Sequence, residues 1–593
     1  MYRIPSLSLG FFCCNIHKIL SSLIGNQINQ KMKYYVYCIL AILLCASCSA
    51  PQNEVTYSIS PDNDSGTPLL KVSMKFKAEP NGETTLLFQD SGWGEDSLHN
   101  VIHHMKLPNI EGDITVNRDS GWITISHPKS LETLDFEYSI KRDVEGELTS
   151  RSTYRPIVTE DYFHVFSHSL LMLPRDYVHT SEDPFNVNIS WKDFPENYTI
   201  HNSFGSGQQE QFIEQINERK FHSAVFMGGD FRVHHINVNN NDVAFAIRGD
   251  WEVFDDTTII DALEKTILTQ RDLMQDHSQT YFSVSIIPTV QERGSSFQGT
   301  GLTNSFAMSA SNNEFLELQG LVYLLNHEHQ HNWIGHLIKN ENEEEQYWFS
   351  EGFTDYYTIK NIAKNKINNS NEDYFIEELN GFIKALYNSP VKEAPNSEIN
   401  YDNFWTSRDY EKLPYRRGAV FAFYLDQKIQ QQTDGEKSLD DVILRIKEDA
   451  LNKTQRLSHP YFMSVVSEYL GEDFKSFFEK HIVNGKLIDL QTMFAEFGYE
   501  YDKTSDVFDL GFEYSDDRRS IASIDKNSEA YKAGLRVNDK FKRISVYNGY
   551  IEYKAEFTVV RDDKEIDISY YPVKHANIAQ LKINDHNKKI LNL

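Results

Sequence analysis

The stretch LVYLLNHEHQHNWIGH, at residues 321–336, holds four histidines and one glutamate among apolar residues. Because residues four apart lie on the same face of a helix, His327 and His331 would present their imidazoles side by side. Glu328 follows the first of them and completes the pattern H-E-x-x-H. In this pattern two imidazoles bind Zn²⁺ and the glutamate acts as a base toward the attacking water. The spacing therefore predicts one Zn²⁺ per chain and a catalytic role for Glu328.

The other two histidines of the stretch are expected to do different things. His329 lies two residues from each predicted ligand, so it should point away from the metal, either outward or behind the ligands. His336 lies beyond Gly335, at which we expect the helix to end, and we assign it no role. The helix itself should be buried on one side, because it carries an apolar face made of Leu318, Leu321, Val322, Leu324 and Leu325.

A catalytic zinc needs a third protein ligand and one open position. Glu351 is the best candidate, because it opens an apolar-periodic helix in YWFSEGFTDYY, with Ser350 as a possible N-cap. Asp355 falls four residues later on the same face, where it could orient a ligating histidine from behind. The other nearby glutamates stand in a polar run that we interpret as a solvated loop: Glu341, Glu343, Glu344 and Glu345.

The chain around this site changes its pattern twice, which indicates several domains in 593 residues. Residues 55–205 consist of short alternating segments with turn residues between them, and they predict an antiparallel β-domain. Residues 206–500 carry apolar residues at helical spacing and predict a mostly α catalytic domain. Residues 506–593 return to strands. The fold class expected is therefore multidomain α+β.

The strand-rich tail resembles a PDZ domain. Leu510, Gly511 and Phe512 look like the carboxylate-binding loop, and SEAYKAGLRVNDKF looks like the turn and strand that follow in bacterial modules of this kind. The resemblance implies that the tail could bind a peptide C-terminus as an added strand. A packing module that binds nothing is the alternative.

Residues 1–48 predict an export signal. Lys31 and Lys33 precede an apolar run that is too short to span a membrane, and LCASC then resembles a bacterial lipoprotein signal with Cys48 as the lipidated residue. Met32 is the expected true start. All five cysteines lie within these residues, so we expect no disulfide and no cysteine-bound zinc in the folded part. The prediction is a membrane-anchored lipoprotein of the periplasm or outer membrane, with a secreted protein as the alternative.

The formal net charge of −28, with no Lys/Arg cluster, argues against a nucleic-acid partner. The motifs together resemble the gluzincin metallopeptidases, and more narrowly the glycyl aminopeptidase-type family. NHEHQHNW, WFSEGFTDYY, YRRGAVFAFYLDQKI, SLDDV and the PDZ-like tail follow in that family's order, from about residue 55 to the end. The interval between His331 and Glu351 is shorter than in that family and is closer to the aminopeptidase N family. The implied fold is an N-terminal β-domain, a thermolysin-like catalytic domain, further helices and a PDZ domain.

The resemblance also implies a tyrosine that stabilises the oxyanion, in a Y-x-K-G pattern. Tyr410 is followed by Glu and Lys but by no glycine, whereas Tyr415 precedes Arg416, Arg417 and Gly418 with the family spacing. Tyr415 is therefore the expected residue.

A glycine-rich strand ending in an amine-binding glutamate is the family's substrate platform. Here GTGLTNSFAM keeps Gly301 and Leu302 but has Thr303 at the glutamate's position. The backbone could still bind substrate as an edge strand. The expected function is zinc-dependent hydrolysis of peptides or proteins, by an aminopeptidase. An endopeptidase of the same fold, or a lipid-anchored PDZ peptide-binding protein with a vestigial metal site, are the alternatives.

Overall fold

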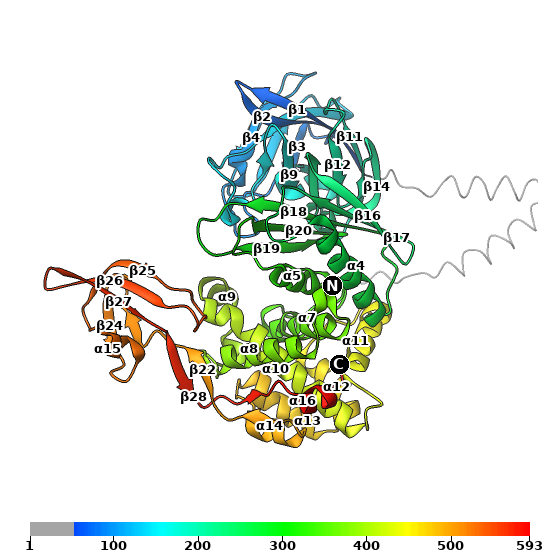
Figure 1. The fold of residues 1–593 in the computed structure, drawn as a ribbon. Helices are drawn as coiled ribbons and strands as arrows, with labels where there is room; N and C mark the ends of the chain where they lie inside the picture. The colour runs from blue at the N-terminus through cyan, green and yellow to red at the C-terminus, as the bar shows by residue number, and fades with distance from the viewer. Residues whose placement is uncertain (1–52) are drawn as a thin grey trace, which may run out of the picture.

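The computed structural model describes residues 53–593 of the chain (Figure 1). The predicted export signal, Cys48 and the other four cysteines lie outside the described residues. Within them, an N-terminal β-region is followed by a second sheet, a helical body and a small C-terminal β-unit. This confirms the multidomain α+β architecture in outline, with an N-terminal β-part and a helical part after it.

The N-terminal β-region consists, within residues 53–229, of three mostly antiparallel sheets. Apolar residues alternate along its strands, so that one face of each strand joins a shared core around Tyr57, Phe136 and Trp191. The largest of these sheets has, in order, the strands β14 (Glu210–Asn217), β11 (Pro184–Trp191), β1 (Glu54–Asp64), β2 (Thr67–Lys77), β7 (Thr133–Lys141) and β4 (Ile102–Lys106). A four-stranded sheet has the order β10 (Leu173–Pro174), β3 (Glu83–Leu87), β6 (Trp122–Ser126) and β5 (Ile114–Asn117). A five-stranded sheet has the order β13 (Gly205–Ser206), β12 (Thr199–Asn202), β15 (Val225–Gly229), β9 (Tyr162–Phe166) and β8 (Ile157–Val158).

This β-region continues past residue 205, where the sequence pattern placed its end. β14 pairs with β11 at a sheet edge, and β15 lies between β12 and β9 in another sheet. A short helix, α3 (Glu218–His222), joins them. The polar sequence of β14, EQFIEQIN, gave no alternating signal because much of an edge strand faces solvent.

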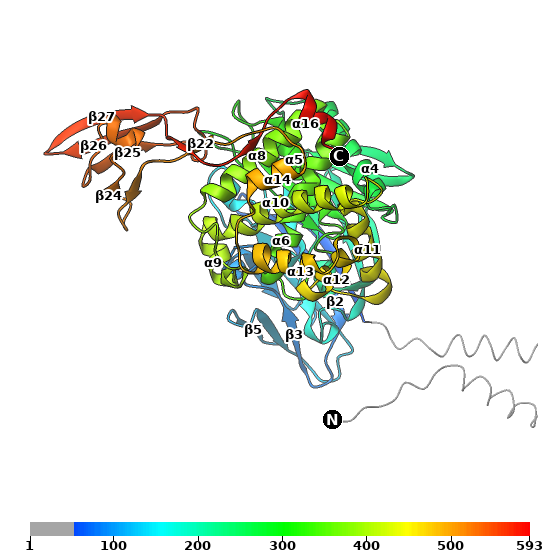
Figure 2. The same ribbon diagram turned by 90° about the horizontal axis from the view of Figure 1, so that it is seen from below.

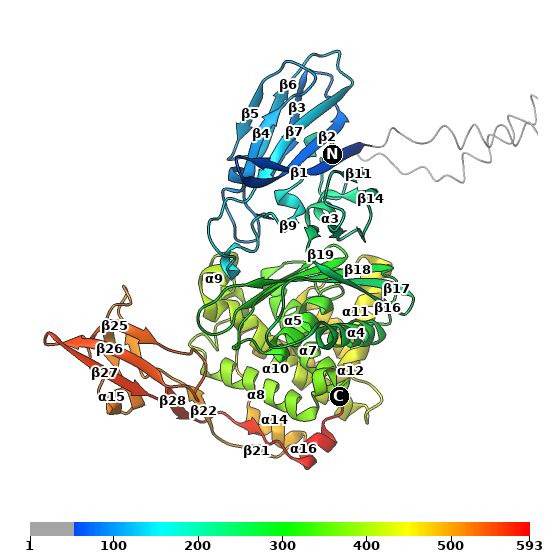
Figure 3. The ribbon, with the colours of Figure 1, turned by 45° about the horizontal axis from the view of Figure 1, so that its top comes forward.

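A further five-stranded sheet follows the N-terminal β-region along the chain, and we call it the second sheet. It lies between the β-region and the helices (Figure 3). Its strands are, in order, β16 (Arg232–Val238), β17 (Asn241–Ile247), β18 (Tyr281–Thr289), β20 (Ser305–Ser311) and β19 (Phe297–Leu302), so the glycine-rich β19 is an edge strand. The helices α4 (Asp256–Leu273) and α5 (Leu318–Gln330) pack beneath it and share its apolar core. The edge strand β19 contacts α5 directly.

The helical body forms the largest core of the described chain, rich in aromatic residues such as Trp348, Phe421 and Phe462. Its elements are α6 (Tyr347–Ser350), α7 (Gly352–Lys364), α8 (Glu372–Asn388), α9 (Tyr401–Thr406), α10 (Arg408–Gln432), α11 (Leu439–Lys453), α12 (His459–Leu470), α13 (Asp473–Phe478) and α14 (Leu490–Glu496). Among residues 53–593, no helix is both long and apolar enough to cross a membrane.

The C-terminal β-unit projects from this body and has a small core of its own (Figure 2). The chain then returns, because β28 pairs with β22, β29 pairs with β21, and α16 ends against the helices. The elements are β21 (Tyr501–Asp502), β22 (Ser505–Phe508), β23 (Phe512–Tyr514), β24 (Ile521–Ile524), α15 (Glu529–Ala533), β25 (Lys540–Ser545), β26 (Ala555–Arg561), β27 (Lys564–Tyr570), β28 (Val573–Ala576), β29 (Gln580–Leu581) and α16 (Asp585–Ile590).

Candidate active site

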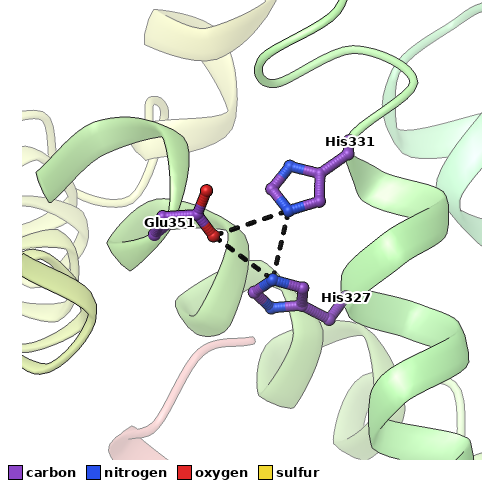
Figure 4. Close-up of side chains that lie close together, drawn as sticks. All are labelled: His327, His331 and Glu351. Carbon is purple, nitrogen blue, oxygen red and sulfur yellow. Dashed lines mark hydrogen bonds and ion pairs between the residues drawn. The ribbon is translucent and has the colours of Figure 1, made fainter. Parts of the chain in front are cut away.

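The H-E-x-x-H pattern begins in the last turn of α5 and ends at His331, the residue that caps this helix. Leu321 and Leu325 on one side of α5 are buried against the second sheet. His327 and His331, one turn apart, face Glu351, which lies between α6 and α7 (Figure 4). Their imidazole Nε2 atoms and the Glu351 carboxylate converge on one point, and they form the candidate metal-binding group of the described chain.

The spacing of these three ligand atoms is close to that of a zinc site, with two separations in the tetrahedral range and the separation between the two imidazoles slightly shorter. The two Nε2 atoms are 3.1 Å apart, and Glu351 Oε2 lies 3.5 Å from that of His327 and 3.6 Å from that of His331. Ligand atoms about 2.0–2.2 Å from a tetrahedrally coordinated zinc stand roughly 3.3–3.6 Å apart. Three donors of this chemistry at this separation leave the fourth tetrahedral position open.

Groups behind the two histidines hold their rings in the required orientation. His327 Nδ1 donates to Asp355 Oδ1 at 2.9 Å, and His331 Nδ1 donates to the carbonyl of Ile334 at 2.9 Å. The hydroxyl of Tyr323 donates to the same carboxylate of Asp355. Such bonds direct each Nε2 lone pair toward the metal position. Asp355 therefore lies where the sequence pattern predicted it.

Glu351 lies at a short break between two helices rather than at a capped start. Its N–H donates to the carbonyl of Tyr347, and the N–H of Asp355 donates to its carbonyl, so the helical path is nearly continuous. The expected N-cap role of Ser350 is wrong, because its hydroxyl bonds back toward Gln346. Burial alone would raise the pKa of Glu351, but the neighbouring histidines hold it well below its usual value. The carboxylate is therefore charged and ready to bind a cation.

Tyr415 reaches the same point from α10. Its ring stacks on that of His327, with centroids 6.1 Å apart and planes 13° apart. Burial and the charge of Glu351 raise the pKa of Tyr415 far above its usual value, so the phenol keeps its proton and can donate it in a hydrogen bond. Tyr410, the alternative, lies away from the site, and its hydroxyl donates to Glu398.

Two glycines allow α10 to come this close. A Cβ atom on Gly352 would overlap the backbone of Gly418, and one on Gly418 would overlap the carbonyl of Trp348. The crossing of α7 and α10 thus has no room for a side chain at either position. Glu351 precedes one of these glycines and Tyr415 lies three residues before the other, so the crossing places them at the site.

Glu328 faces the edge strand β19. Its Oε2 lies 3.6 Å from the position that a Cβ on Gly301 would take. Burial raises the pKa of the Glu328 carboxyl above its usual value, against the charges of His331 and His327. The carboxylate is thus held between the metal position and the strand predicted to bind substrate.

Thr303, at the position of the missing glutamate, is anchored to the N-terminal β-region. Its hydroxyl donates to the carbonyl of Lys220 at 2.7 Å, and its N–H donates to the carbonyl of Ser223 at 2.6 Å. Leu302 before it is buried in the core between the two parts. Both residues hold the end of β19 in place, and the hydroxyl of Thr303 is already engaged.

The remaining two histidines of the opening stretch differ from the sequence interpretation. His329 points away from the metal position as expected but is buried, with Nδ1 bonded to Gln270 Oε1 at 2.6 Å. The helix ends at Gln330, earlier than Gly335 suggested. His336 was assigned no role, yet its Cε1 lies 3.6 Å from the same Cβ position on Gly301, beside Glu328.

No sequence motif identified two further residues that lie near the site. The hydroxyl of Tyr154, from the N-terminal β-region, donates to the carbonyl of Gly299 in β19 at 3.2 Å. Glu343, which the sequence pattern placed in a solvated loop, is exposed, but partial burial of its carboxyl and the charge of Glu351 raise its pKa. The contact of Tyr154 joins parts distant in sequence, which no local pattern records.

The predicted carboxylate loop of the C-terminal unit lies at the start of β23. Gly511 has φ +74°, and its N–H already donates to Asp509 Oδ1 at 2.7 Å. The carbonyl of Leu510 accepts from the hydroxyl of Tyr570, and Phe512 packs against the unit's core. The Gly511 N–H is thus engaged by the chain's own carboxylate.

Comparisons with known proteins place the fold. No protein-family model and no curated protein matches this chain. Among solved structures, the chain is similar to an aminopeptidase N family protein from Idiomarina loihiensis, with 16% identity, a TM-score of 0.69, and coverage of 91% of this chain and 99% of that one. A likeness at this identity establishes a shared fold.

Two weaker likenesses point to proteins of related description. An M1 zinc metallopeptidase from Deinococcus radiodurans has 11% identity and a TM-score of 0.44, covering 74% of this chain and 94% of that one. A yeast LTA4 hydrolase in complex with bestatin has 14% identity and a TM-score of 0.43, covering 76% of this chain and 72% of that one. The fold assignment rests on the first comparison alone: this chain has the overall fold of an aminopeptidase N family protein.

Proposed function

We propose that this chain is a zinc-dependent metallopeptidase that removes residues from the amino end of peptides. The observation that carries the proposal is the convergence of His327, His331 and Glu351 at separations close to those of tetrahedral zinc ligands, with Glu328 beside them. The fold shared with an aminopeptidase N family protein supports it. A glycyl aminopeptidase-type specificity is the narrower proposal, and it rests on the order of the sequence motifs.

The three ligands would hold the metal, and zinc, when bound, would supply Lewis acidity toward the scissile carbonyl. Glu328 is placed to take a proton from the attacking water and to deliver it to the leaving nitrogen. Burial raises the pKa of this carboxyl above its usual value, which makes the carboxylate a stronger base toward water.

The carbonyl oxygen becomes an oxyanion as the water attacks, and Tyr415 is the donor placed to stabilise it. Its ring lies against His327, next to the metal position, and its proton is retained at all ordinary pH values. A donor that is already oriented stabilises developing charge without reorganisation, an effect commonly worth about 3 kcal/mol. The substrate backbone would pair with β19, the edge strand of the second sheet.

Recognition of a free amino terminus needs negative charge near the metal. Thr303 cannot supply it, whereas Glu343 carries an exposed carboxylate whose pKa is raised by partial burial and by the charge of Glu351. We therefore favour an aminopeptidase and name Glu343 as the residue that would face the ammonium group. An endopeptidase of the same fold is the competing possibility, because a strand platform alone does not require a free terminus.

The proposal also includes export as a lipid-anchored protein through Cys48 and binding of a peptide C-terminus at the C-terminal unit. A lipid-anchored binding protein with a vestigial metal site would have no use for the bond between Asp355 and His327, or for the tyrosine stacked above it. These supports of the metal ligands favour the enzyme.

One experiment separates the candidates. The purified protein is loaded with zinc, its metal content is measured, and one peptide panel is offered in free and N-acetylated forms. An aminopeptidase cleaves the free forms only, and an endopeptidase cleaves both. Protein that binds no zinc, or that hydrolyses neither form, would contradict the proposal.

A further inference from the structure

A cavity of about 960 Å³ lies next to the candidate site, where three parts of the chain meet. One wall is α3 of the N-terminal β-region, another is the segment after α5, and the third is the end of α11 with the loop that follows it. The turn at Leu302 and Thr303 forms the side toward β19. A cavity of this size accommodates a short peptide or a side chain with its flanking backbone.

Four cationic side chains line this cavity, although the whole chain has a formal charge of −28. Arg219 and Lys220 come from α3, Lys339 from the segment after α5, and Arg456 from the loop after α11. Glu214 is the carboxylate among the lining residues of the described chain. The cavity is therefore strongly basic on a molecule that is acidic elsewhere.

The four cations are not neutralised by neighbouring carboxylates. Among residues 53–593, none of them forms an ion pair within 4.0 Å, whereas many other cations of the chain do. The charges of the other three act on Lys339: burial and then repulsion from Arg219, Arg456 and Lys220 lower its pKa, and attraction to Glu182 opposes the effect only in part. Four like charges gathered around one cavity, with no carboxylate paired to any of them, favour an anionic ligand.

His336 belongs both to the cavity wall and to the surroundings of Glu328. This residue lines the cavity, and its ring lies beside the same point on Gly301 that Glu328 approaches. Leu302 likewise belongs both to the cavity wall and to β19. A peptide bound along the edge strand would thus extend from the metal position into the basic cavity.

We propose that this cavity is a substrate subsite for carboxylates, so that the enzyme prefers peptides that carry an acidic side chain or a free C-terminal carboxylate within a few residues of the scissile bond. The inference rests on the proposed peptidase function and adds the substrate class. The two sources of the carboxylate have the same chemistry, and the test distinguishes them.

The test compares three forms of one free-amine tetrapeptide. The first has glutamine at an internal position and a C-terminal amide, the second replaces that glutamine by glutamate, and the third keeps the glutamine but has a free C-terminal carboxylate. We expect kcat/KM for at least one carboxylate form to exceed that of the neutral form about tenfold or more. The preference should weaken in high salt, because the Debye length falls to about 3 Å at 1 M.

The double variant Lys339→Gln/Arg456→Gln should reduce this ratio to near one. A matched control, Lys526→Gln/Arg543→Gln, removes the same two residue types from exposed positions on the C-terminal unit and should keep the wild-type ratio. Equal kcat/KM for all three peptides in the wild type would overturn the subsite. A preference that survives Lys339→Gln/Arg456→Gln would overturn it as well, since the carboxylate would then be recognised elsewhere.

A binding measurement keeps this result separate from the proposed activity. Zinc-loaded Glu328→Gln protein is titrated with the same three peptides by calorimetry. Binding of a carboxylate form about tenfold tighter than the neutral form, lost in the added Lys339→Gln/Arg456→Gln background, supports the subsite even if no peptide is cleaved by the wild type. Equal affinities for the three peptides contradict it, whether or not the enzyme is active.

Discussion

The candidate metal centre and the carboxylate loop of the C-terminal β-unit were both predicted from short motifs, but the structure arranges the groups as predicted only at the metal centre. At the metal centre, helical periodicity alone brings His327 and His331 together, and their partners stand behind them. At the predicted carboxylate loop, the N–H of Gly511 is engaged by Asp509. A motif within a regular helix carries its geometry with it, whereas a loop motif depends on which groups the neighbouring chain supplies.

The largest loss of activity should come from replacing Glu328, the proposed base beside the metal position. Glu328→Gln removes the proton acceptor while keeping the side chain's size, so kcat should fall by about 10³-fold or more. Zinc content, measured by atomic absorption, should stay at one per chain, because Glu328 is not a ligand. Activity close to wild type would show that the helix motif is not the reacting site.

The next largest loss of activity should come from Tyr415, which the crossing of α7 and α10 places at the site. Tyr415→Phe removes one hydrogen-bond donor but keeps the ring that stacks on His327. We expect kcat to fall by about 10²-fold with KM changed much less, because the lost bond forms in the transition state. The matched control is Tyr410→Phe, whose hydroxyl bonds to Glu398 away from the site. An equal loss in both variants would argue for a structural effect.

A smaller effect, on metal affinity, is expected from Asp355, which lies behind the candidate ligand His327. Asp355→Ala removes the acceptor of the His327 Nδ1 proton, and loss of such a partner commonly lowers metal affinity about 10- to 100-fold. Competition with a chelator of known affinity measures the change directly. Unchanged affinity would mean that packing alone orients the imidazole.

The smallest effect should come from the C-terminal unit. Gly511→Ala places a Cβ against the side chain of Ser528 at φ +74°, and we expect a loss of about 1–3 kcal/mol in the unit's stability. Hydrogen exchange of β23 and β24 should report it, while zinc content stays unchanged. A loss of zinc on this substitution would show that the two regions are coupled, contrary to the separate cores of the structure.

The outline of the fold followed from the sequence wherever the periodicity was strong. The helices α5, α7 and α10 and the alternating strands of the N-terminal region are such cases. The boundary at residue 205 failed because β14 is a polar edge strand, and its membership of a sheet depends on the partner β11. His336 was missed for a similar reason, since it meets Gly301 only after β19 folds over α5.

What the sequence determined by itself is the set of candidate groups: two imidazoles and a glutamate within one helical turn, a carboxylate directly before α7, and an aspartate one turn on. These follow from 3.6 residues per turn, a property of the local backbone. Only the tertiary structure decided how Tyr415 reaches the metal position, where β19 ends, and that four unpaired cations from three parts of the chain surround one cavity. Those arrangements depend on close packing between distant segments, and no local pattern in the chain encodes which segments will meet.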